Sequence, residues 1–228
     1  MQKVIDMRAQ PPYAETVPSR VAAPGWGNVV QRSVDLLIAS FAIIFFAPIM
    51  VAAALGVWLQ DGGPVFYAHR RIGLNGREFN CLKFRSMLID SEARLRQLLA
   101  ESAEARAEWE RDHKLRNDPR ITPIGSFLRR SSLDELPQLF NVLAGDMSIV
   151  GPRPIVTAEA KRYGRRFSHY CSVRPGITGL WQISGRNDVS YRRRVAIDTC
   201  YAQKRTLALD LQIIVATVPS VLLRKGSY

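Results

Sequence analysis

The chain has 228 residues, with 32 Lys and Arg against 20 Asp and Glu, a formal net charge of +12 and an apolar content of 47%. This apolar content supports a packed core and excludes a disordered tail, and the length allows one domain, or one domain with a membrane element. Since 28 of the basic residues follow residue 60, that part of the chain favours anionic partners such as nucleic acid, anionic lipid or phosphate-bearing substrates.

Residues 1–27 contain several prolines and little periodic apolar content, and this pattern predicts a flexible lead-in. Residues 28–60 follow as a predicted membrane element, because the run from Leu36 to Leu59 has 24 residues without a charge. As a straight helix this run would measure about 36 Å and could cross a hydrocarbon core of about 30 Å. A simple transmembrane span is therefore one interpretation.

Pro48 lies in the interior of this run, where a proline removes a backbone hydrogen bond and clashes with the preceding turn. We expect it to bend or break the helix into halves of roughly 18 Å each, too short to span. Basic residues flank both ends of the run, and Lys and Arg concentrate on the cytoplasmic side of membranes. This favours a re-entrant helix-break-helix over a kinked span, which stays the alternative.

Residues 61–228 are predicted to form the cytoplasmic domain. Two short strands, residues 65–67 and 79–84, surround a Gly-Leu-Asn-Gly sequence at 73–76 that is typical of a turn, and they predict a small β-hairpin. Asp90 or Ser91 can cap a long amphipathic helix that ends before Pro119.

An apolar segment near the C-terminus, residues 211–223, is too short to span a membrane and could lie at its surface or in the core. We therefore expect an α-rich α+β fold. It is a membrane-associated single domain with a Pro-broken re-entrant helix, a small β-hairpin and surface amphipathic helices. The three cysteines and three histidines are isolated in sequence and predict neither disulfides nor a zinc site.

Two adjacent carboxylates, Asp134 and Glu135, lie at the predicted start of a helix. Ser132 and Glu135 have the spacing of a capping box, in which Ser132 caps the helix and Glu135 reaches back to it. A carboxylate in the first turn lies in the positive end of the helix dipole, which favours the ionised form of a nucleophile or metal ligand. Adjacent helical positions point about 100° apart, so the two acids should serve different roles.

Several basic residues occur in rigid or turn settings that suggest a phosphate clamp. Arg129 lies just before the acids, Arg153 is held between two prolines, and Arg186 follows a glycine. Guanidinium groups fixed in this way could neutralise a phosphate that the two acids would otherwise repel. Lys83 and Arg85, a little further upstream, could add to the same clamp.

These residues belong to segments that carry a resemblance to a known family, namely residues 83–87, 132–139, 145–154 and 174–187, together with the Pro-broken apolar helix. Over about residues 30–228 the chain resembles the bacterial sugar transferases, the monotopic phosphoglycosyl transferases. This family moves a sugar 1-phosphate from a UDP-sugar onto undecaprenyl phosphate at the start of cell-surface polysaccharide synthesis. The chain looks most like the ExoY-type galactose-phosphate transferases of exopolysaccharide synthesis.

The resemblance implies a covalent mechanism in a catalytic domain formed by residues 61–228. Asp134 matches the nucleophile, which attacks the β-phosphorus of the UDP-sugar and expels UMP. Glu135 matches the second acid, which would hold Mg²⁺ with Asp134. Arg129 and Arg153 match arginines that clamp phosphates. Lys83, Arg85 and Arg186 are further candidates for binding substrate phosphates. The family has Ser-Pro at many helix breaks, whereas this chain has Ala47-Pro48.

The same resemblance implies UDP-sugar, undecaprenyl phosphate and inner-membrane lipid as partners, no nucleic acid, and a location at the cytoplasmic face of the bacterial inner membrane. Galactose or glucose is the expected sugar, and the oligomeric state is left open. The alternative is a non-catalytic, membrane-anchored basic protein that binds anionic lipid or nucleic acid. Against it, the arginines occur in Gly/Pro turns and no aromatic-basic recognition module is visible.

Overall fold

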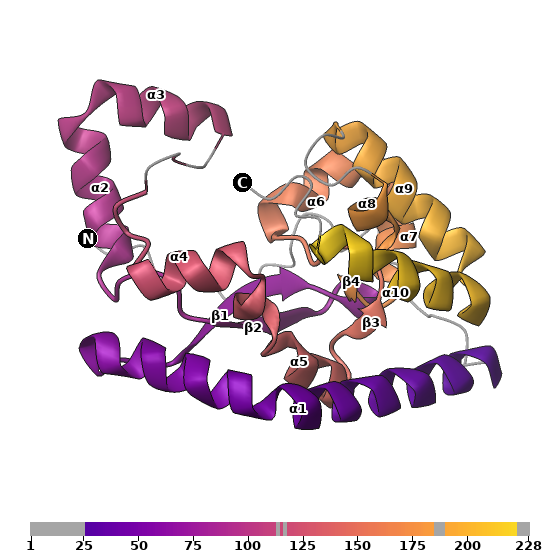
Figure 1. The fold of residues 1–228 in the computed structure, drawn as a ribbon. Coiled ribbons are helices and arrows are strands. Elements are labelled where there is room, and N and C mark those ends of the chain that lie inside the picture. The colour runs from indigo at the N-terminus through magenta and orange to yellow at the C-terminus, as the bar shows by residue number, and fades with distance from the viewer. Residues whose placement is uncertain (1–25, 113–114, 116–117, 185–189, 223–228) are drawn as a thin grey trace. The chain divides into compact units, whose positions relative to one another are not determined.

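The computed structural model describes residues 26–112, 115, 118–184 and 190–222, so most of the expected lead-in lies outside the described residues (Figure 1). The chain divides into two compact units. Unit 1 comprises the described residues up to Ala42, His69–Cys81 and those from Gln138 onward. Unit 2 comprises Ile43–Ala68 and Leu82–Pro137.

Helix α1, Trp26–Asp61, forms the predicted membrane element and contributes to both units. The helix continues through Pro48, so the complete break that the sequence allowed is not observed, and a bend at this proline, the other outcome that the sequence allowed, stays a prediction. A proline removes a single backbone hydrogen bond, and here Ala52, Ala53 and Ala54, which favour helix strongly, follow within two turns. By length and composition, Asn28–Asp61 could cross a membrane.

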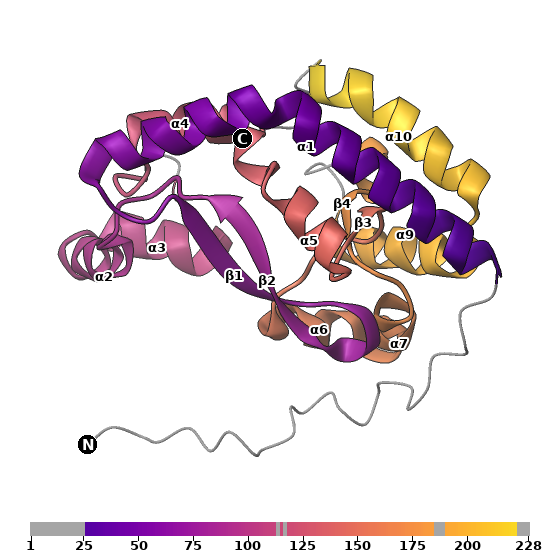
Figure 2. The same cartoon turned by 90° about the horizontal axis from the view of Figure 1, so that it is seen from below.

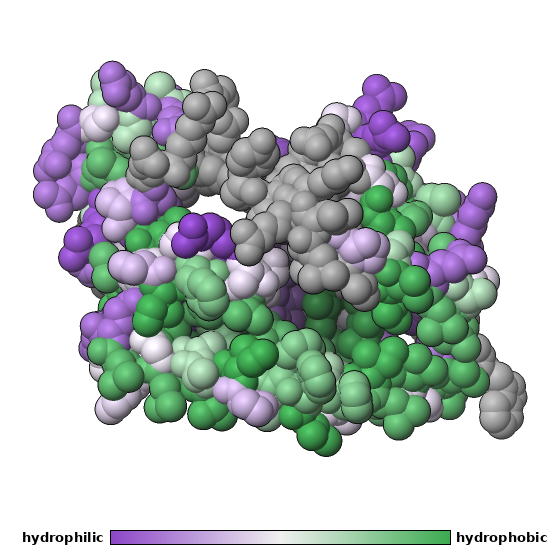
Figure 3. Space-filling view, viewed as in Figure 1, coloured by the Kyte–Doolittle hydropathy of each residue, from purple (hydrophilic) through white to green (hydrophobic). Residues whose placement is uncertain are grey.

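Most of the apolar surface of α1 is exposed, and only 11% of its most apolar stretch is buried. Figure 3 shows apolar side chains gathered along this helix, at the lower edge of the view. The large exposed apolar residues of α1 are Val29, Val30, Leu37, Phe41, Ile44, Phe45, Ile49, Val51, Leu55, Trp58 and Leu59. A surface of this kind favours contact with lipid or with another protein.

The predicted β-hairpin is confirmed. Strand β1, Phe66–Ile72, pairs with β2, Glu78–Phe84, and the two lie side by side in both ribbon views (Figures 1 and 2). A 3₁₀ turn, η2, Leu74–Gly76, joins them, and Asn75 and Gly76 have φ values of 58° and 71°. Asn and Gly are the residues that adopt this left-handed backbone at low cost. The Asn-Gly pair therefore fixes the turn that the sequence predicts.

Unit 2 contains the predicted amphipathic region as two helices, α2, Ser91–Glu101, and α3, Ala103–Asp112, rather than one long helix. Ser102 between them has an extended backbone, and its hydroxyl accepts a hydrogen bond from the amide of Ala105 at 3.1 Å. Ser102 thus acts as an N-cap that starts a second helix. Helix α4, Pro123–Arg130, and the 3₁₀ turn η3, Leu133–Glu135, follow.

The core of unit 2 joins the second part of α1 to β2, α4 and η3. Its buried residues are Met50, Val57, Phe84 and Leu128, and the partly buried residues around them include Ile124, Leu133 and Leu136. Leu133 and Leu136 flank Asp134 and Glu135 in sequence, so burial of these two leucines holds the acids in a fixed place.

Unit 1 is mostly helical. Its elements after the hairpin are α5, Gln138–Ala144; β3, Ser148–Val150; α6, Thr157–Tyr163; η4, Gly164–Arg166; α7, Phe167–Cys171; β4, Gly176–Thr178; α8, Leu180–Ile183; α9, Tyr191–Lys204; and α10, Leu207–Leu222. Strands β3 and β4 are parallel, with Ser148 opposite Gly176 and Val150 opposite Thr178. Together with the hairpin they confirm the α-rich α+β class.

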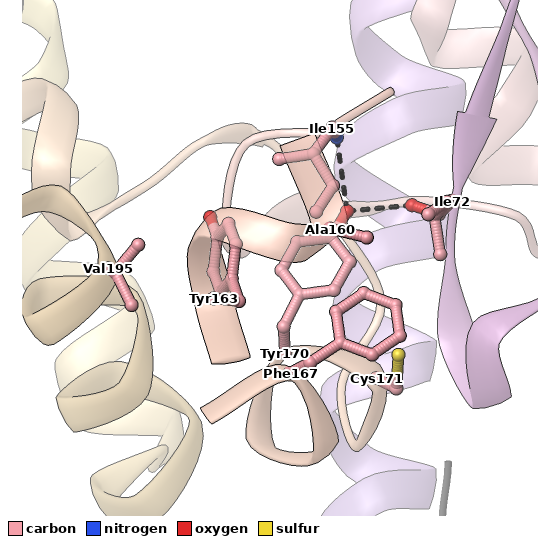
Figure 4. Close-up of a cluster of buried hydrophobic side chains, with 8 residues drawn as sticks. All are labelled: Ile72, Ile155, Ala160, Tyr163, Phe167, Tyr170, Cys171 and Val195. Atoms are coloured by element: carbon pink, nitrogen blue, oxygen red, sulfur yellow. Dashed lines mark hydrogen bonds between the residues drawn. The ribbon is translucent and has the colours of Figure 1, made fainter. Parts of the chain in front are cut away.

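The core of unit 1 is centred on α7 (Figure 4). The Tyr170 hydroxyl donates a hydrogen bond to the carbonyl of Ile72 at 2.7 Å and accepts one from the amide of Ile155 at 3.2 Å. This single hydroxyl thereby satisfies backbone groups from two segments that are distant in sequence. Helix α10, the segment whose position was left open, buries Ile213 and exposes Leu211 and Val215.

Polar contacts tie the first part of α1 to the rest of unit 1. Asp35 is buried, and its carboxylate accepts hydrogen bonds from the hydroxyl of Ser148 at 2.8 Å and from the amide of Ile149 at 2.9 Å. Gln31 donates a hydrogen bond to Asp210 on α10 at 2.9 Å. Buried polar groups are costly unless they are paired, so these contacts fix the register of α1 on β3 and α10.

Candidate active site

Asp134 and Glu135, hereafter the acid pair, lie in unit 2 on the short turn η3. The predicted capping box is wrong, because Ser132 makes no side-chain cap and η3 is a 3₁₀ turn of three residues. Ser132 adopts the left-handed backbone, with φ of 58°, and this leads the chain from the end of α4 directly into η3. No α-helix begins at the acid pair, so there are no free amides of a first helical turn for the Ser132 side chain to cap.

Asp134 is 8% exposed. Burial raises the pKa of its carboxyl group, the nearby Glu135 raises it further, and the charges of Lys83 and Arg129 act in the opposite direction. The expectation that the first turn of a helix favours the ionised form of Asp134 is therefore wrong, because no α-helix starts here and the net effect of the surroundings raises the pKa. The groups that favour the ionised form here are two cationic side chains.

Lys83, on β2, contacts both members of the acid pair. Its Nζ donates a hydrogen bond to Glu135 Oε1 at 2.6 Å and lies 3.8 Å from Asp134 Oδ2. The side chains of Lys83 and Glu135 are 27% and 33% exposed, so the contact lies at the margin of the core rather than inside it. The sequence predicted that Lys83 binds substrate phosphate, whereas in the structure its ammonium contacts the two acids.

Arg129, in the last turn of α4, is held by a residue that the sequence analysis did not select. Its Nε donates a hydrogen bond to the hydroxyl of Ser86 at 2.7 Å, and Ser86 is 8% exposed. Burial lowers the pKa of Arg129, whereas the charges of Asp134 and Asp118 raise it. The hydrogen bond from Nε to Ser86 fixes the orientation of the guanidinium and therefore the direction of its two terminal nitrogens.

Ser86 is itself fixed by α4. Its carbonyl accepts a hydrogen bond from the amide of Thr122 at 3.2 Å, and the hydroxyl of Thr122 caps α4 through the amide of Gly125 at 2.9 Å. A Cβ atom on Gly125 would lie 2.0 Å from the Ser86 oxygen, so only glycine allows this approach. The sequence signal for Ser86 was its place in the segment 83–87, beside two basic candidates.

Arg85 has other partners. Its side chain forms an ion pair with Asp61, and its Nη2 donates a hydrogen bond to the carbonyl of Val57 at 3.4 Å. Asp61 is the last residue of α1 and Arg85 is 7% exposed. Arg85 thus binds the C-terminal end of α1, and this contact stabilises the helix terminus.

Arg153 belongs to unit 1, where its guanidinium carbon lies 5.5 Å from the centre of the Trp181 ring. Arg194 lies 5.2 Å from the same ring centre. Near them, burial raises the pKa of Asp198 to about 6, against the opposing effects of a hydrogen bond from Tyr163 and the charges of Arg194 and Arg153.

Arg153 was predicted from the sequence as a phosphate ligand, but the aromatic and acidic residues around it were not predicted as site residues. Trp181 and Asp198 are 5% and 2% exposed. From the sequence alone, a residue such as Trp181 is expected to pack in the core. No motif indicates that it lies beside a cluster of charged side chains. Arg186, the remaining candidate, lies outside the described residues.

The acid pair supplies two carboxylates, which are the type of ligand that Mg²⁺ prefers. Among the described residues, no group of three or more His, Cys, Asp or Glu side chains could hold a metal ion. Mg²⁺ commonly binds through one or two carboxylates and completes its octahedral shell with waters and substrate phosphates. Asp134 and Glu135 therefore fit Mg²⁺ that arrives with a phosphate ligand, and they do not form an all-protein cage.

This arrangement can stabilise a phosphorylated ligand beside a buried carboxylate. Chemically, the carboxylate of Asp134 can act as a nucleophile and that of Glu135 as a metal ligand, and the charges of Lys83 and Arg129 can balance phosphate oxygens. Preorganised cations of this kind stabilise the charge that develops in phosphoryl transfer.

Comparison with known proteins gives a consistent result. The family described as "Bacterial sugar transferase" matches residues 26–224. The chain is 50% identical over 202 residues to the exopolysaccharide production protein ExoY of Rhizobium meliloti, which covers 89% of each chain. It is also 50% identical over 199 residues to the undecaprenyl-phosphate galactose phosphotransferase of Salmonella typhimurium, covering 87% of this chain and 42% of that protein.

A further relative is the UDP-glucose:undecaprenyl-phosphate glucose-1-phosphate transferase of Xanthomonas campestris, 42% identical over 210 residues, which cover 88% of this chain and 40% of that protein. The chain thus spans most of the length of ExoY but less than half the length of the Salmonella and Xanthomonas relatives.

Proposed function

This chain belongs to the bacterial sugar transferase family, and we propose that it transfers a sugar 1-phosphate from a UDP-sugar to undecaprenyl phosphate with release of UMP. The observation that carries the proposal is the buried carboxylate of Asp134, on which the positive charges of Lys83 and Arg129 both act. The names of relatives support the lipid acceptor, and they include both a galactose and a glucose transferase.

In the first step, a carboxylate oxygen of Asp134 attacks the β-phosphorus of the UDP-sugar. A new bond forms between this oxygen and phosphorus, and the bond from the β-phosphorus to the bridging oxygen breaks. The bridging oxygen leaves with the electron pair on UMP, and the sugar phosphate stays on Asp134 as an acyl phosphate. Covalent catalysis of this type divides one difficult transfer into two easier ones.

In the second step, a phosphate oxygen of undecaprenyl phosphate attacks the phosphorus of the acyl phosphate. The bond to the Asp134 oxygen breaks, the carboxylate is regenerated, and the product is undecaprenyl diphosphate sugar. The burial of Asp134 supports this step, because a site with little water access protects a reactive acyl phosphate from hydrolysis.

The cations act on the phosphates in both steps. Arg129, aimed by Ser86, can bind phosphate oxygens through its terminal nitrogens, and Lys83 offers a flexible point charge beside the acids. Arg153 and Arg186 stay candidates for phosphate binding. A bound Mg²⁺, held by Glu135 and Asp134, would neutralise diphosphate charge and so allow an anionic nucleophile to approach.

We further propose that the protein lies at the cytoplasmic face of the inner membrane, with both ends of α1 on that side. The exposed apolar surface of α1 supports insertion, and the basic residues at both ends support the orientation. With Cys200 replaced, Asn28→Cys and Pro64→Cys would be treated in intact cells with a membrane-impermeant maleimide. Neither should react until the cells are opened, and labelling of Asn28→Cys in intact cells would contradict the re-entrant path.

The activity itself is tested with a panel of UDP-sugars and undecaprenyl phosphate, scored by UMP release from the purified chain in detergent with Mg²⁺. UMP release with UDP-galactose or UDP-glucose, abolished in Asp134→Asn, is the expected result. No turnover of any UDP-sugar by the folded wild-type protein would contradict the proposal. A panel is needed because one hydroxyl distinguishes these sugars, and no motif reveals the contacts that read it.

A further inference from the structure

Lys83 occupies the position on Glu135 that a divalent cation would need. Its Nζ is 2.6 Å from Glu135 Oε1 and 3.8 Å from Asp134 Oδ2. Mg²⁺ bound to Glu135 would lie at about 2.0–2.1 Å from a carboxylate oxygen. An ammonium and a divalent cation so close together repel strongly, even at the effective dielectric constant of about 20 that suits partly exposed sites. A divalent cation that binds Glu135 through Oε1 therefore competes with Lys83 for that oxygen.

The charges of the site point in the same direction. When the acids are ionised, the two negative charges of Asp134 and Glu135 are matched by the two positive charges of Lys83 and Arg129, which both act on Asp134. A divalent cation alone would add two positive charges to a neutral group. A diphosphate alone would add negative charge beside two carboxylates. The cation and the diphosphate together leave the balance nearly unchanged.

Resting on the proposed function, we propose that Lys83 is an exchangeable counterion. In the free protein it neutralises the acid pair, and it leaves Glu135 when a divalent cation binds together with the diphosphate of the nucleotide. The released ammonium then turns to the incoming phosphate oxygens. The long, flexible side chain of lysine allows this movement, and its partial exposure leaves room for it.

Two consequences distinguish this exchange from a fixed salt bridge. First, the metal binds weakly without nucleotide and much more tightly with it, because each ligand neutralises the charge of the other. Second, removing the charge of Lys83 strengthens metal binding in the absence of nucleotide, since the competing cation is gone. A lysine that only positioned the acids would give the opposite result, because the metal site would lose its order.

The experiment measures Mn²⁺ binding to the full chain in detergent by electron paramagnetic resonance of the free ion, with and without UDP. Lys83→Met and Lys83→Gln remove the charge, and Lys83→Arg keeps it. We expect the two neutral variants to bind Mn²⁺ about tenfold more tightly than the wild type without UDP, equivalent to about 1.4 kcal/mol. We expect UDP to tighten Mn²⁺ binding at least tenfold in the wild type and clearly less in these variants.

Glu135→Gln reports whether the measured ion occupies the acid pair. It should weaken Mn²⁺ binding both in the wild type and in the Lys83→Met variant. Unchanged or weaker Mn²⁺ binding in both neutral Lys83 variants would overturn the proposal, as would an unchanged affinity in Glu135→Gln. A melting temperature close to that of the wild type shows that each variant is folded. Failure of the proposed function would appear separately, as absent UMP release by the wild type, because the Mn²⁺ titration needs no turnover.

Discussion

The hydroxyl of Ser86 accepts a 2.7 Å hydrogen bond from Nε of Arg129. Of the proposed phosphate ligands, Arg129 is the one nearest to Asp134 in sequence, and this contact fixes its side chain. Ser86 lies on the segment after β2 and Arg129 ends α4, so the contact joins two elements of unit 2. The direction of the guanidinium thereby depends on a small neutral side chain. Arg129 supplies the positive charge, and Ser86 fixes its orientation.

Ser86→Ala should lower kcat/KM for the UDP-sugar by about tenfold, because a charged hydrogen bond of roughly 1.5 kcal/mol that aims Arg129 is lost. Steady-state UMP release measures the effect. Ser131→Ala is the matched control, since among the described residues the Ser131 hydroxyl donates to two carbonyls of α4, those of Phe127 and Leu128. Equal activities of the two variants would show that Arg129 needs no anchor.

The ion pair of Arg85 with Asp61 predicts a structural role for a residue that the sequence placed among the phosphate ligands. Arg85→Met and Asp61→Asn should each lower the melting temperature, and the double variant should lose less than the sum of the two single losses. The KM for the UDP-sugar should stay near the wild-type value in both. A raised KM without a change in melting temperature would show instead that Arg85 binds the substrate.

Asp198 makes stability depend on pH. Burial raises its pKa from 3.8 to about 6 in the folded protein, so the folded state favours the protonated carboxyl. The associated stability is present in full below about pH 4 and is lost as pH rises through about 6, with a total of about 3 kcal/mol. The stabilities of wild type and Asp198→Asn, measured by unfolding from pH 4 to 8, should diverge over this interval. Parallel curves would contradict the shift.

The sequence predicted those elements whose signal is local. The β-hairpin followed from two short apolar runs around Asn75 and Gly76, residues that accept the left-handed backbone of the turn. The apolar character of α1 and the α-rich class were equally evident. The two acids were selected as candidate site residues because they are adjacent carboxylates in a strongly basic chain, and their catalytic role stays a prediction.

Other features depended on contacts that no local pattern contains. Helix α1 continues through Pro48 without a complete break, although proline predicts a bend or a break. Ser132 fits a capping box in sequence, yet its left-handed backbone places the acid pair on a 3₁₀ turn. The role of Ser86 depends on its approach to Gly125 and Arg129, which lie about 40 residues away in sequence. Tertiary packing decided each of these outcomes, and it overrides local preference.

The covalent bond to Asp134 is the central claim, and intact-protein mass spectrometry tests it most directly. The purified chain is mixed with Mg²⁺ and its UDP-sugar in the absence of undecaprenyl phosphate, then quenched in mild acid. The account predicts a mass increase of one sugar phosphate, mapped to the peptide that carries Asp134, absent in Asp134→Asn and removed when undecaprenyl phosphate is added before the quench. An adduct that persists in Asp134→Asn, or UMP release by that variant at the wild-type rate, would contradict it.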